Sequence, residues 1–321
     1  MRRQGPSHNL RLVSSQSDAL VTLGKYLQFQ DYKFITITPA SHHRVIDRDQ
    51  SCEATSLIDI FGWSRFFRRS QFPAVSDMLD DAGELEKSGA LFRSKVRFST
   101  LSKQLFVHSA FPTDAPDSVF FGPDTYRFAR VIRQNFPSRK KCPTRIIDLG
   151  CGSGVGGIYA ASLVSGGRPD LLLVDINDKA LQYSRVNCIL NGTQQTTTLI
   201  NSDLFASFSE AADLIISNPP YLVDPKARAY RHGGAHGYDL SIRIVEESFN
   251  YLRPGGRLIL YTGAPVVGGE DHFLAALTRS FAAKSRTFHY EEVDPDVFGE
   301  ELDQPCYAHA DRIAAVSVVV H

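Results

Sequence analysis

The sequence lacks three features that often indicate function directly: an excess of one charge, closely paired cysteines and long apolar runs. Its 35 basic and 35 acidic side chains balance, so no overall field draws the chain towards nucleic acid, although a local basic face fits the same balance. The five cysteines are odd in number and lack the paired spacing of a zinc site or a disulfide framework. We therefore expect reduced thiols and no metal at Cys52, Cys142, Cys151, Cys188 and Cys306.

No apolar run approaches the roughly 18 residues that cross a bilayer. The first residues, Met1 to Asp18, are polar and lack the apolar core of a secretory signal. We therefore expect a cytoplasmic protein that does not enter the membrane. A chain of 321 residues, 43% of them hydrophobic, predicts two globular domains, divided here as 1–115 and 116–321.

Apolar strand-like runs alternate with helix-like stretches from about residue 145 onward. The runs are 145–149, 171–175, 197–200, 213–217 and 257–262, and the helix-like stretches are 156–165, 178–191 and 241–252. This alternation predicts an α/β domain with a parallel, Rossmann-like sheet. Two further runs, 287–293 and 313–320, have no obvious helix between them and predict an antiparallel hairpin at the sheet edge, which makes seven strands.

The first domain shows no such alternation. A helical pattern over 72–87 followed by strand patterns over 90–99 and 104–109 predicts a small α+β, winged-helix-like domain. Its cationic side chains are consistent either with a phosphate-facing patch or with an ordinary solvated face. These side chains are Arg65, Arg68, Arg69, Arg93, Lys95 and Arg97.

A glycine-rich loop follows the first predicted strand of the sheet and precedes a helix. It reads Asp148-Leu149-Gly150-Cys151-Gly152-Ser153-Gly154, and such a loop lets the backbone approach a nucleoside cofactor closely. Asp175 ends the next strand, where its carboxylate can accept both ribose hydroxyls, and Ile176 and Asn177 follow it. Asp203 and Leu204 follow the third strand, where Asp203 can accept from an adenine amino group. Cys151 is interpreted as a packing residue.

The same loop also satisfies a dinucleotide pattern, because Gly152, Gly154 and Gly157 are spaced as G-x-G-x-x-G. An NAD-binding oxidoreductase, or a nucleotide-binding module without catalysis, therefore remains an alternative. Asp148 argues against it, since a carboxylate at the strand end repels a pyrophosphate but can hold an amino-acid portion through water.

Asn218-Pro219-Pro220-Tyr221 follows the fourth strand at the same sheet edge. A planar amide or exocyclic amine attacks a methyl donor poorly unless both of its N–H groups are held by acceptors. The Asn218 side-chain oxygen and the Pro219 carbonyl can supply those acceptors. Two prolines keep the backbone rigid, and Tyr221 can stack on a flat substrate. The alternative is a simple turn after a strand.

These residues resemble the class I methyltransferases, and within them the HemK-like branch that methylates glutamine side chains of release factors. The resemblance covers roughly residues 118–265 and includes the glycine-rich segment 233–240. It implies S-adenosylmethionine as cofactor, S-adenosylhomocysteine as product, and a release-factor-like protein as partner. Asn218 would then orient the glutamine amide. Enzymes that methylate amino groups of RNA or DNA bases share Asn-Pro-Pro-aromatic, so nucleic acid is a second candidate substrate and a small metabolite a third.

The segment 120–127 occupies the position where this family has a Pro-Glu-Thr-Glu-like segment over the cofactor. We expect Phe121, Thr125 and Tyr126 to line the cleft, with an interdomain linker as the alternative. The family's N-terminal part is a helical bundle, whereas the pattern here includes a hairpin. His232 and His236 make an incomplete metal site and are interpreted as loop histidines.

Overall fold

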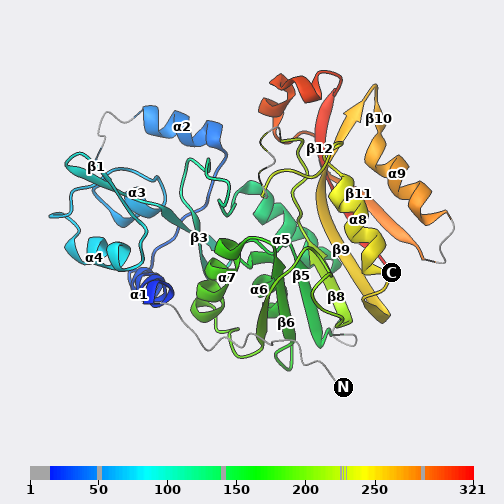
Figure 1. Ribbon diagram of the computed structural model, residues 1–321, viewed down its shortest axis with the longest axis horizontal. Helices are drawn as coiled ribbons and strands as arrows, with labels where there is room; N and C mark the ends of the chain where they lie inside the picture. Colours follow the sequence, from blue (N-terminus) through cyan, green and yellow to red (C-terminus); the bar gives the residue numbers. More distant parts are fainter. Residues whose placement is uncertain are drawn as a thin grey trace.

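The structure, a computed structural model, describes residues 15–48, 53–138, 142–224, 226, 228, 230–282 and 286–321. Cys52 and the polar residues 1–14 lie outside this range. The C-terminal part contains one large sheet, with strands in the order β11-β12-β9-β8-β5-β6-β7 and β10 paired to the end of β9 (Figure 1). The strands are β5 (Arg145–Leu149), β6 (Asp170–Asp175), β7 (Thr197–Asn201), β8 (Ala212–Ser217), β9 (Leu252–Val267), β10 (Glu270–Asp271), β11 (Phe288–Asp294) and β12 (Arg312–Val320).

The five strands from β7 to β9 are parallel, whereas β12 is antiparallel to both β9 and β11. Counted from β5, the parallel strands lie in the order 3-2-1-4-5, which is that of a doubly wound nucleotide-binding sheet. The predicted α/β class, the Rossmann-like sheet and the antiparallel pair at its edge are confirmed.

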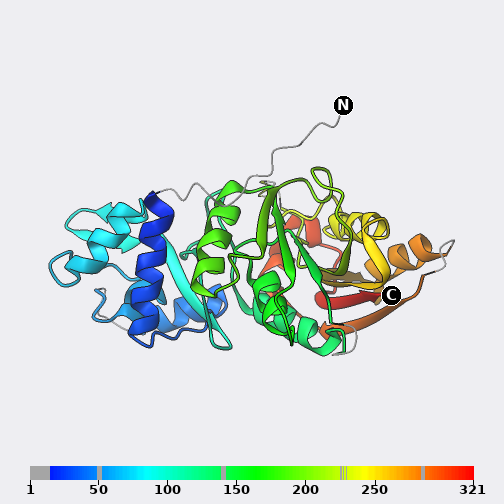
Figure 2. The same cartoon turned by 90° about the horizontal axis from the view of Figure 1, so that it is seen from below.

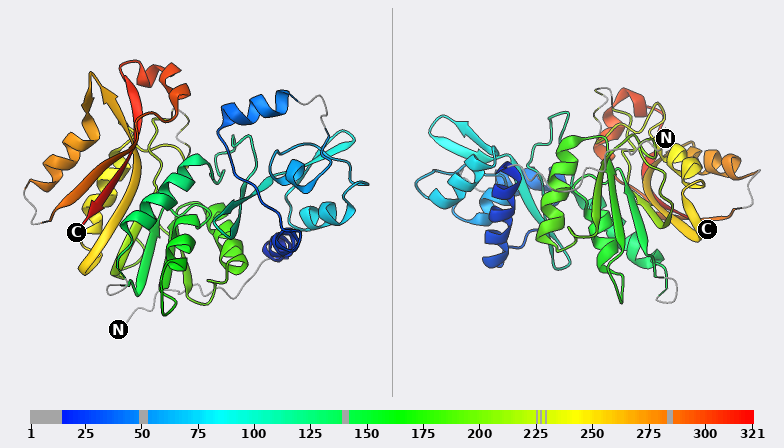
Figure 3. Two further views of the ribbon diagram at one scale, coloured as in Figure 1. Left: turned by 180° about the vertical axis from the view of Figure 1, so that it is seen from behind. Right: turned by 60° about the horizontal axis from the view of Figure 1, so that its bottom comes forward.

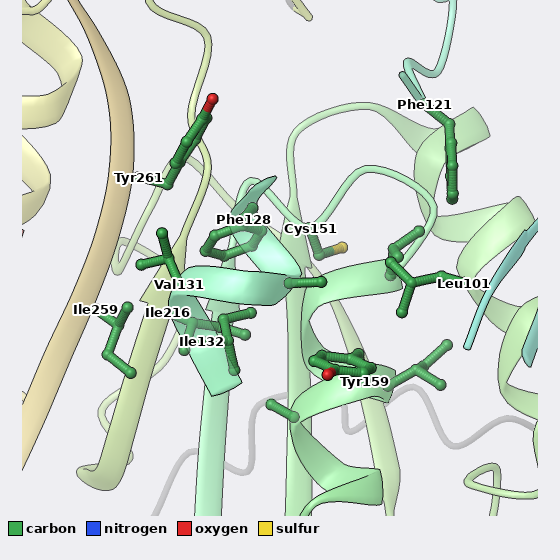
Figure 4. Packing of buried hydrophobic residues seen from close by; sticks show 14 of the residues in the cluster. Leu101, Phe121, Phe128, Val131, Ile132, Cys151, Tyr159, Ile216, Ile259 and Tyr261 are labelled. Atoms are coloured by element: carbon green, nitrogen blue, oxygen red, sulfur yellow. The ribbon is translucent and has the colours of Figure 1, made fainter. Parts of the chain in front are cut away.

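Helices cover both faces of this sheet because neighbouring strand residues point to opposite sides. Ile146 of β5 packs in the same apolar cluster as residues of α5 and α6, while Ile147 packs with residues of α8 and α9. The helices are α5 (Pro123–Asn135), α6 (Val155–Ser162), α7 (Asp178–Leu190), α8 (Asp239–Ser248) and α9 (His272–Phe281). In Figure 4, Phe128 of α5 lies between Tyr261 of β9 and Cys151 of the glycine loop.

The N-terminal part has four helices and two separate hairpins among its described residues. They are α1 (Ser15–Phe29), α2 (Pro39–Asp47), α3 (Leu57–Phe61), α4 (Pro73–Asp81), β1 (Leu85–Ser88), β2 (Leu91–Ser94), β3 (Val96–Leu101) and β4 (Gln104–Ser109). The helix expected over 72–87 therefore ends early, because Gly83 adopts a φ of 71° and the chain turns into β1. The strand expected over 90–99 is divided at Lys95, whose N–H donates to the Glu84 carbonyl at 2.8 Å.

Four of the six basic side chains of the predicted patch form ion pairs. Arg68 pairs with Glu53 at 2.6 Å, and Arg93 pairs with Glu86 at 2.8 Å. Arg69 contacts Asp77 and Asp80, Arg65 lies 4.0 Å from Asp59, and Arg97 is only 5% exposed. The structure therefore favours ion-paired or packed side chains here over a patch that faces phosphates.

The two parts share one apolar cluster. Leu20, Leu23 and Leu27 of α1 pack in the same cluster as Tyr183 and Val186 of α7. Figure 2 shows α1 in blue and α7 in green on facing sides of the boundary, and both views of Figure 3 place α7 between the N-terminal part and the sheet. The division at residue 115 stays a prediction, but the packing extends across it. No helix in the described ranges is both long and apolar enough to cross a bilayer.

Candidate active site at the carboxyl edge of the sheet

A cavity of about 420 Å³ opens at the carboxyl ends of the parallel strands. Small-ligand sites span roughly 300 to 1,000 Å³, and in open parallel sheets they lie where the chain order reverses, which here is between β5 and β8. Most of the predicted site residues line it. They are Thr125, Asp148, Gly150, Cys151, Gly152, Asp175, Ile176, Asn177, Asp203, Leu204, Asn218, Pro219, Pro220 and Tyr221.

The glycine loop presents its backbone to the cavity. Gly150 and Gly152 adopt φ values of 64° and 54°, which side chains with a Cβ rarely tolerate. Gly154, also predicted to bind cofactor, does not line the cavity. It is the left-handed N-cap of α6, and atoms of Leu173 and Ser184 lie 3.0 Å from where its Cβ would stand. A larger residue at this position would crowd Leu173 and Ser184, so glycine lets the loop pack onto the sheet.

Two carboxyl groups lie under this loop, of which Asp148 is buried and Asp175 is half-buried. Asp175 accepts the N–H of Gly152 at 2.8 Å and that of Asn177 at 2.9 Å, and Asp148 accepts the N–H of Gly157 at 2.7 Å. Burial raises the pKa of Asp148 to about 7 and also raises the pKa of Asp175 above its usual range. Carboxylates that are costly to charge favour a ligand with a cationic group, such as an amino acid's ammonium.

The rim beyond Asp175 is apolar. Ile176 lines the cavity yet is 55% exposed, which is unusual for a large aliphatic side chain and suits a flat apolar ligand ring. The Asn177 side chain already makes two hydrogen bonds within the protein. Its oxygen caps α7 by accepting the Lys179 N–H at 3.0 Å, and its amide nitrogen donates to the Asp117 carbonyl at 3.0 Å. Together, Asp175, Ile176 and the glycine loop fit the nucleoside part of a cofactor.

Asp203 reaches the cavity but already has a cationic partner. Arg243 of α8 donates from one nitrogen to both carboxylate oxygens, at 3.0 and 3.2 Å. A carboxylate offers about four acceptor positions, so Asp203 retains capacity for a ligand amino group.

The tetrapeptide is held firmly at the end of β8. Ser217, the residue before it, donates its hydroxyl to the Leu149 carbonyl at 2.8 Å and thereby ties the end of β8 to that of β5. Asn218 lines the cavity, and its side-chain oxygen is buried with no hydrogen-bond partner among the described residues. An orphaned buried acceptor costs about 1–3 kcal/mol, so the oxygen needs a donor, which a ligand can supply once the amide turns toward the cavity.

Tyr221 differs from its predicted role as a stacking platform. The side chain is only 6% exposed, and its ring lies against the backbone of Gly263 in β9 and edge-on to Phe298. Its hydroxyl donates to Asp124 of α5 at 2.7 Å, and burial raises the pKa of that hydroxyl well above its usual range. Packing between strand and helix leaves little of the ring for a substrate.

The glycine-rich segment 233–240 packs directly on the tetrapeptide. A Cβ at Gly233 would lie 2.6 Å from the Pro220 carbonyl oxygen, and one at Gly237 would lie 2.7 Å from that of Tyr221. Backbone hydrogen bonds join Gly233 to Leu222 at 2.8 Å and Leu222 to Arg231 at 3.0 Å. This close approach explains why glycine is needed there.

The predicted cleft residues are only partly correct. Thr125 lines the cavity, but Phe121 and Tyr126 do not. Phe121 stacks on His108 at 4.8 Å, and Tyr126 accepts the Thr36 N–H at 3.1 Å, so both face the N-terminal part. Phe120 lines the cavity instead of Phe121.

Several cavity residues were not predicted. Asp124 follows the proline of the segment compared with Pro-Glu-Thr-Glu, so its position carried a signal. Phe298 comes from the long connection between β11 and β12, and Tyr230, Arg231 and His232 come from the segment after the tetrapeptide. No local motif marks these, because only the folded chain brings them to the cavity.

His232 lines the cavity and accepts the Asp224 N–H at 3.3 Å, while His236 contacts Asp239 at 2.9 Å. Both lie in irregular segments, as expected of loop histidines. Within the described ranges, no group of three or more side chains has the arrangement of a metal site. Cys142, Cys151, Cys188 and Cys306 are free thiols, and burial raises the pKa of Cys151. Cys151 belongs to an apolar cluster, which agrees with a packing role.

The family model of the methyltransferase small domain matches residues 124–283, which contain the glycine loop and the tetrapeptide. The ribosomal protein uL3 glutamine methyltransferase of Bordetella pertussis is 35% identical over 144 residues, covering 41% of this chain and 46% of that protein. The release factor glutamine methyltransferase of Deinococcus radiodurans is 28% identical over 172 residues, covering 49% and 55% respectively.

Among solved structures, the 16S rRNA N2 G1207 methyltransferase of T. thermophilus, solved with AdoMet and guanosine, is similar at a TM-score of 0.45 and 14% identity, over 79% of this chain and 62% of that one. The chain spans about half the length of the two curated relatives. The resemblance to class I methyltransferases and to their glutamine-methylating branch is confirmed.

Proposed function

We propose that this chain, whose residues 124–283 belong to the methyltransferase small domain family, methylates the side-chain nitrogen of a protein glutamine with S-adenosylmethionine as donor. The relatives named as glutamine methyltransferases support this acceptor. The proposed partner is therefore another protein, which presents a glutamine in an accessible loop.

One observation carries the proposal: the orphaned oxygen of Asn218 in the cavity wall. A primary amide carries two N–H groups, and holding them leaves the nitrogen lone pair free to point at an electrophile. A turn of the Asn218 amide about its last torsion, which is soft, presents its oxygen to the cavity. Orientation lowers the barrier substantially. The N–H proton that the methyl group replaces passes to solvent through the acceptor that holds it, and no strong base is required because an amide nitrogen with a fourth bond is strongly acidic.

The residues also fit the cofactor. Asp175 and Ile176 would hold its nucleoside, with Asp203 available to the adenine amino group, and the glycine loop with Asp148 would hold its amino-acid portion. S-adenosylmethionine, when bound, supplies an electrophilic methyl group on a sulfonium. The chain's own contribution is to exclude water and to fix the acceptor through Asn218 and Pro219.

A base amino group of RNA or DNA has the same planar geometry and is the second candidate acceptor. The ion pairs of Arg68, Arg69 and Arg93 argue against it, because they occupy cations that would otherwise meet phosphates. The NAD oxidoreductase alternative loses its basis, since the glycine loop lies within the methyltransferase match.

The test uses an extract of cells that lack this protein, in which unmodified acceptor accumulates. Purified protein and methyl-labelled S-adenosylmethionine are added, and the label is followed after treatment with protease or ribonuclease. We expect protease-sensitive label that acid hydrolysis releases as methylamine, because hydrolysis cleaves an N-methyl amide. Label in RNA, or label that stays on an amino acid after hydrolysis, contradicts a glutamine acceptor.

Asn218→Ala is the decisive variant. It should lower turnover by at least about 100-fold while calorimetry shows nearly unchanged S-adenosylmethionine affinity, because only the contact to the acceptor is removed. Asn135→Ala, which removes an amide at the end of α5 outside the cavity wall, is the matched control. Wild-type turnover in Asn218→Ala would remove this residue from the mechanism.

A further inference from the structure

Asp124 is a buried carboxyl group that lies between the two halves of the site. It is 3% exposed, lines the cavity, and stands in the first turn of α5. It accepts the hydroxyl of Tyr221 at 2.7 Å on one oxygen and the hydroxyl of Tyr261 at 2.8 Å on the other. Arg127, one turn along the helix, donates to it at 3.0 Å and continues to Asp294 at 2.9 Å.

These bonds act on the tetrapeptide from its far end. Ser217, the residue before Asn218, is hydrogen-bonded to the end of β5, and Tyr221, the residue after the two prolines, is hydrogen-bonded to α5. Between these two anchors the prolines allow little change of φ. The Asn218 backbone is therefore held from both sides by two contacts that do not involve its own side chain.

We infer that Asp124 is a positioning residue, which sets the placement of Asn218 by holding the Tyr221 hydroxyl. The inference rests on the proposed function, in which Asn218 orients the acceptor. It also assigns Tyr221 a role other than stacking. The ring packs against Gly263, and the hydroxyl fixes the tetrapeptide relative to α5 through its hydrogen bond to Asp124.

The two tyrosines provide a matched pair of variants. Tyr221→Phe and Tyr261→Phe each remove one hydroxyl from the same carboxylate, at nearly the same distance, but Tyr261 belongs to β9 and does not line the cavity. A purely structural network predicts the same outcome for both variants, whereas positioning through Tyr221 predicts different outcomes.

The first readout needs no methyl acceptor. The side-chain amide signals of Asn218 in a nitrogen-15 NMR spectrum, assigned by their absence in Asn218→Ala, should shift or broaden in Tyr221→Phe and in Asp124→Asn but not in Tyr261→Phe. Calorimetric affinity for S-adenosylmethionine should stay within about twofold in all three. An unchanged Asn218 signal in Tyr221→Phe overturns the inference even if glutamine methylation is confirmed.

The second readout is turnover of the labelled acceptor. Tyr221→Phe should lower kcat about ten-fold with KM nearly unchanged, the size expected for one hydrogen bond to a charged group, and Tyr261→Phe should stay within about twofold. In an Asn218→Ala background the Tyr221→Phe effect should vanish, because the residue that it positions is gone. Equal losses in both tyrosine variants, or an undiminished effect without Asn218, contradict positioning. If no glutamine is labelled, the NMR comparison still decides the inference.

Discussion

At the residue scale, Asp148 is a carboxyl group whose buried environment differs strongly from water. It lies near the end of β5, only 2% exposed, and among the described residues one backbone N–H, that of Gly157 at 2.7 Å, compensates its charge. Burial therefore raises its pKa to about 7, far above the usual 3.8. A neutral carboxyl below that pH and a carboxylate above it should interact differently with a cationic ligand group.

This shift gives a pH dependence with a defined sign. Between about pH 4 and pH 7 the folded protein binds more protons at Asp148 than the unfolded chain does, so its contribution to stability is largest below pH 4 and is lost as the pH rises through 7. We expect Asp148→Asn to flatten that part of the profile, measured as urea unfolding without cofactor. An unchanged slope would show that Asp148 is already ionised in the folded protein.

At the element scale, β9 and the tetrapeptide approach each other without space for a side chain. Gly263 lies in the middle of β9, opposite Ala315 of β12, and a Cβ on it would collide with the Tyr221 ring. Strand β9 thus contacts the Tyr221 ring, and the Tyr221 hydroxyl in turn contacts α5 through Asp124. A substitution in β9 that displaces Tyr221 should therefore also displace Asn218.

Gly263→Ala should destabilise the protein by about 1–3 kcal/mol, the usual cost of overpacking a core, and should also lower turnover by displacing Tyr221. Gly167→Ala is the matched control, because nothing lies within 4 Å of its Cβ position and its φ is not in the left-handed range. Chemical denaturation and methyl transfer are measured on both variants. Full stability of Gly263→Ala would mean that the ring moves freely, which the packing does not predict.

At the scale of the whole molecule, the two parts are joined through α7. Tyr183 donates its hydroxyl to Glu84 at 2.8 Å, and Asn187 accepts the Val107 N–H at 2.8 Å, so the same helix that packs on the sheet also completes the N-terminal core. Gly24 of α1 lies so close to Leu190 that a Cβ would collide with its side chain. Parts joined by a shared core should unfold together.

We expect one heat-absorption peak for the full chain in calorimetry. Val186→Ala, a cavity-forming change in α7, should lower the stability of that single transition by about 1–3 kcal/mol and loosen hydrogen-exchange protection in α1 as well as in α7. Leu277→Ala in α9 serves as the comparison, because it packs in the separate cluster on the other face of the sheet. Two separate peaks, with α1 protection unaffected by Val186→Ala, would show independent domains.

The features predictable from sequence are those encoded by neighbouring residues. Strand β5 was predicted with its observed bounds, and the predicted 178–191 helix agrees with α7 to within one residue. The glycine loop and Asn218 were found because each motif is continuous in the chain and follows an apolar strand. The helix expected over 72–87 was wrong in its second half because one glycine, Gly83, adopts a left-handed conformation that an apolar pattern does not reveal.

The sequence by itself determined the α/β class, the edge of the sheet where the cavity opens, and the residues at the carboxyl ends of β5, β6, β7 and β8. Only the tertiary structure decided that Asp124 holds Tyr221, that Phe121 and Tyr126 face away from the cavity, and that α7 belongs to two cores. Asp124 and Tyr221 are 97 residues apart, and Phe298 is farther still. Periodicity and motifs report local conformation, whereas contacts at that separation arise only from how the strands and helices pack.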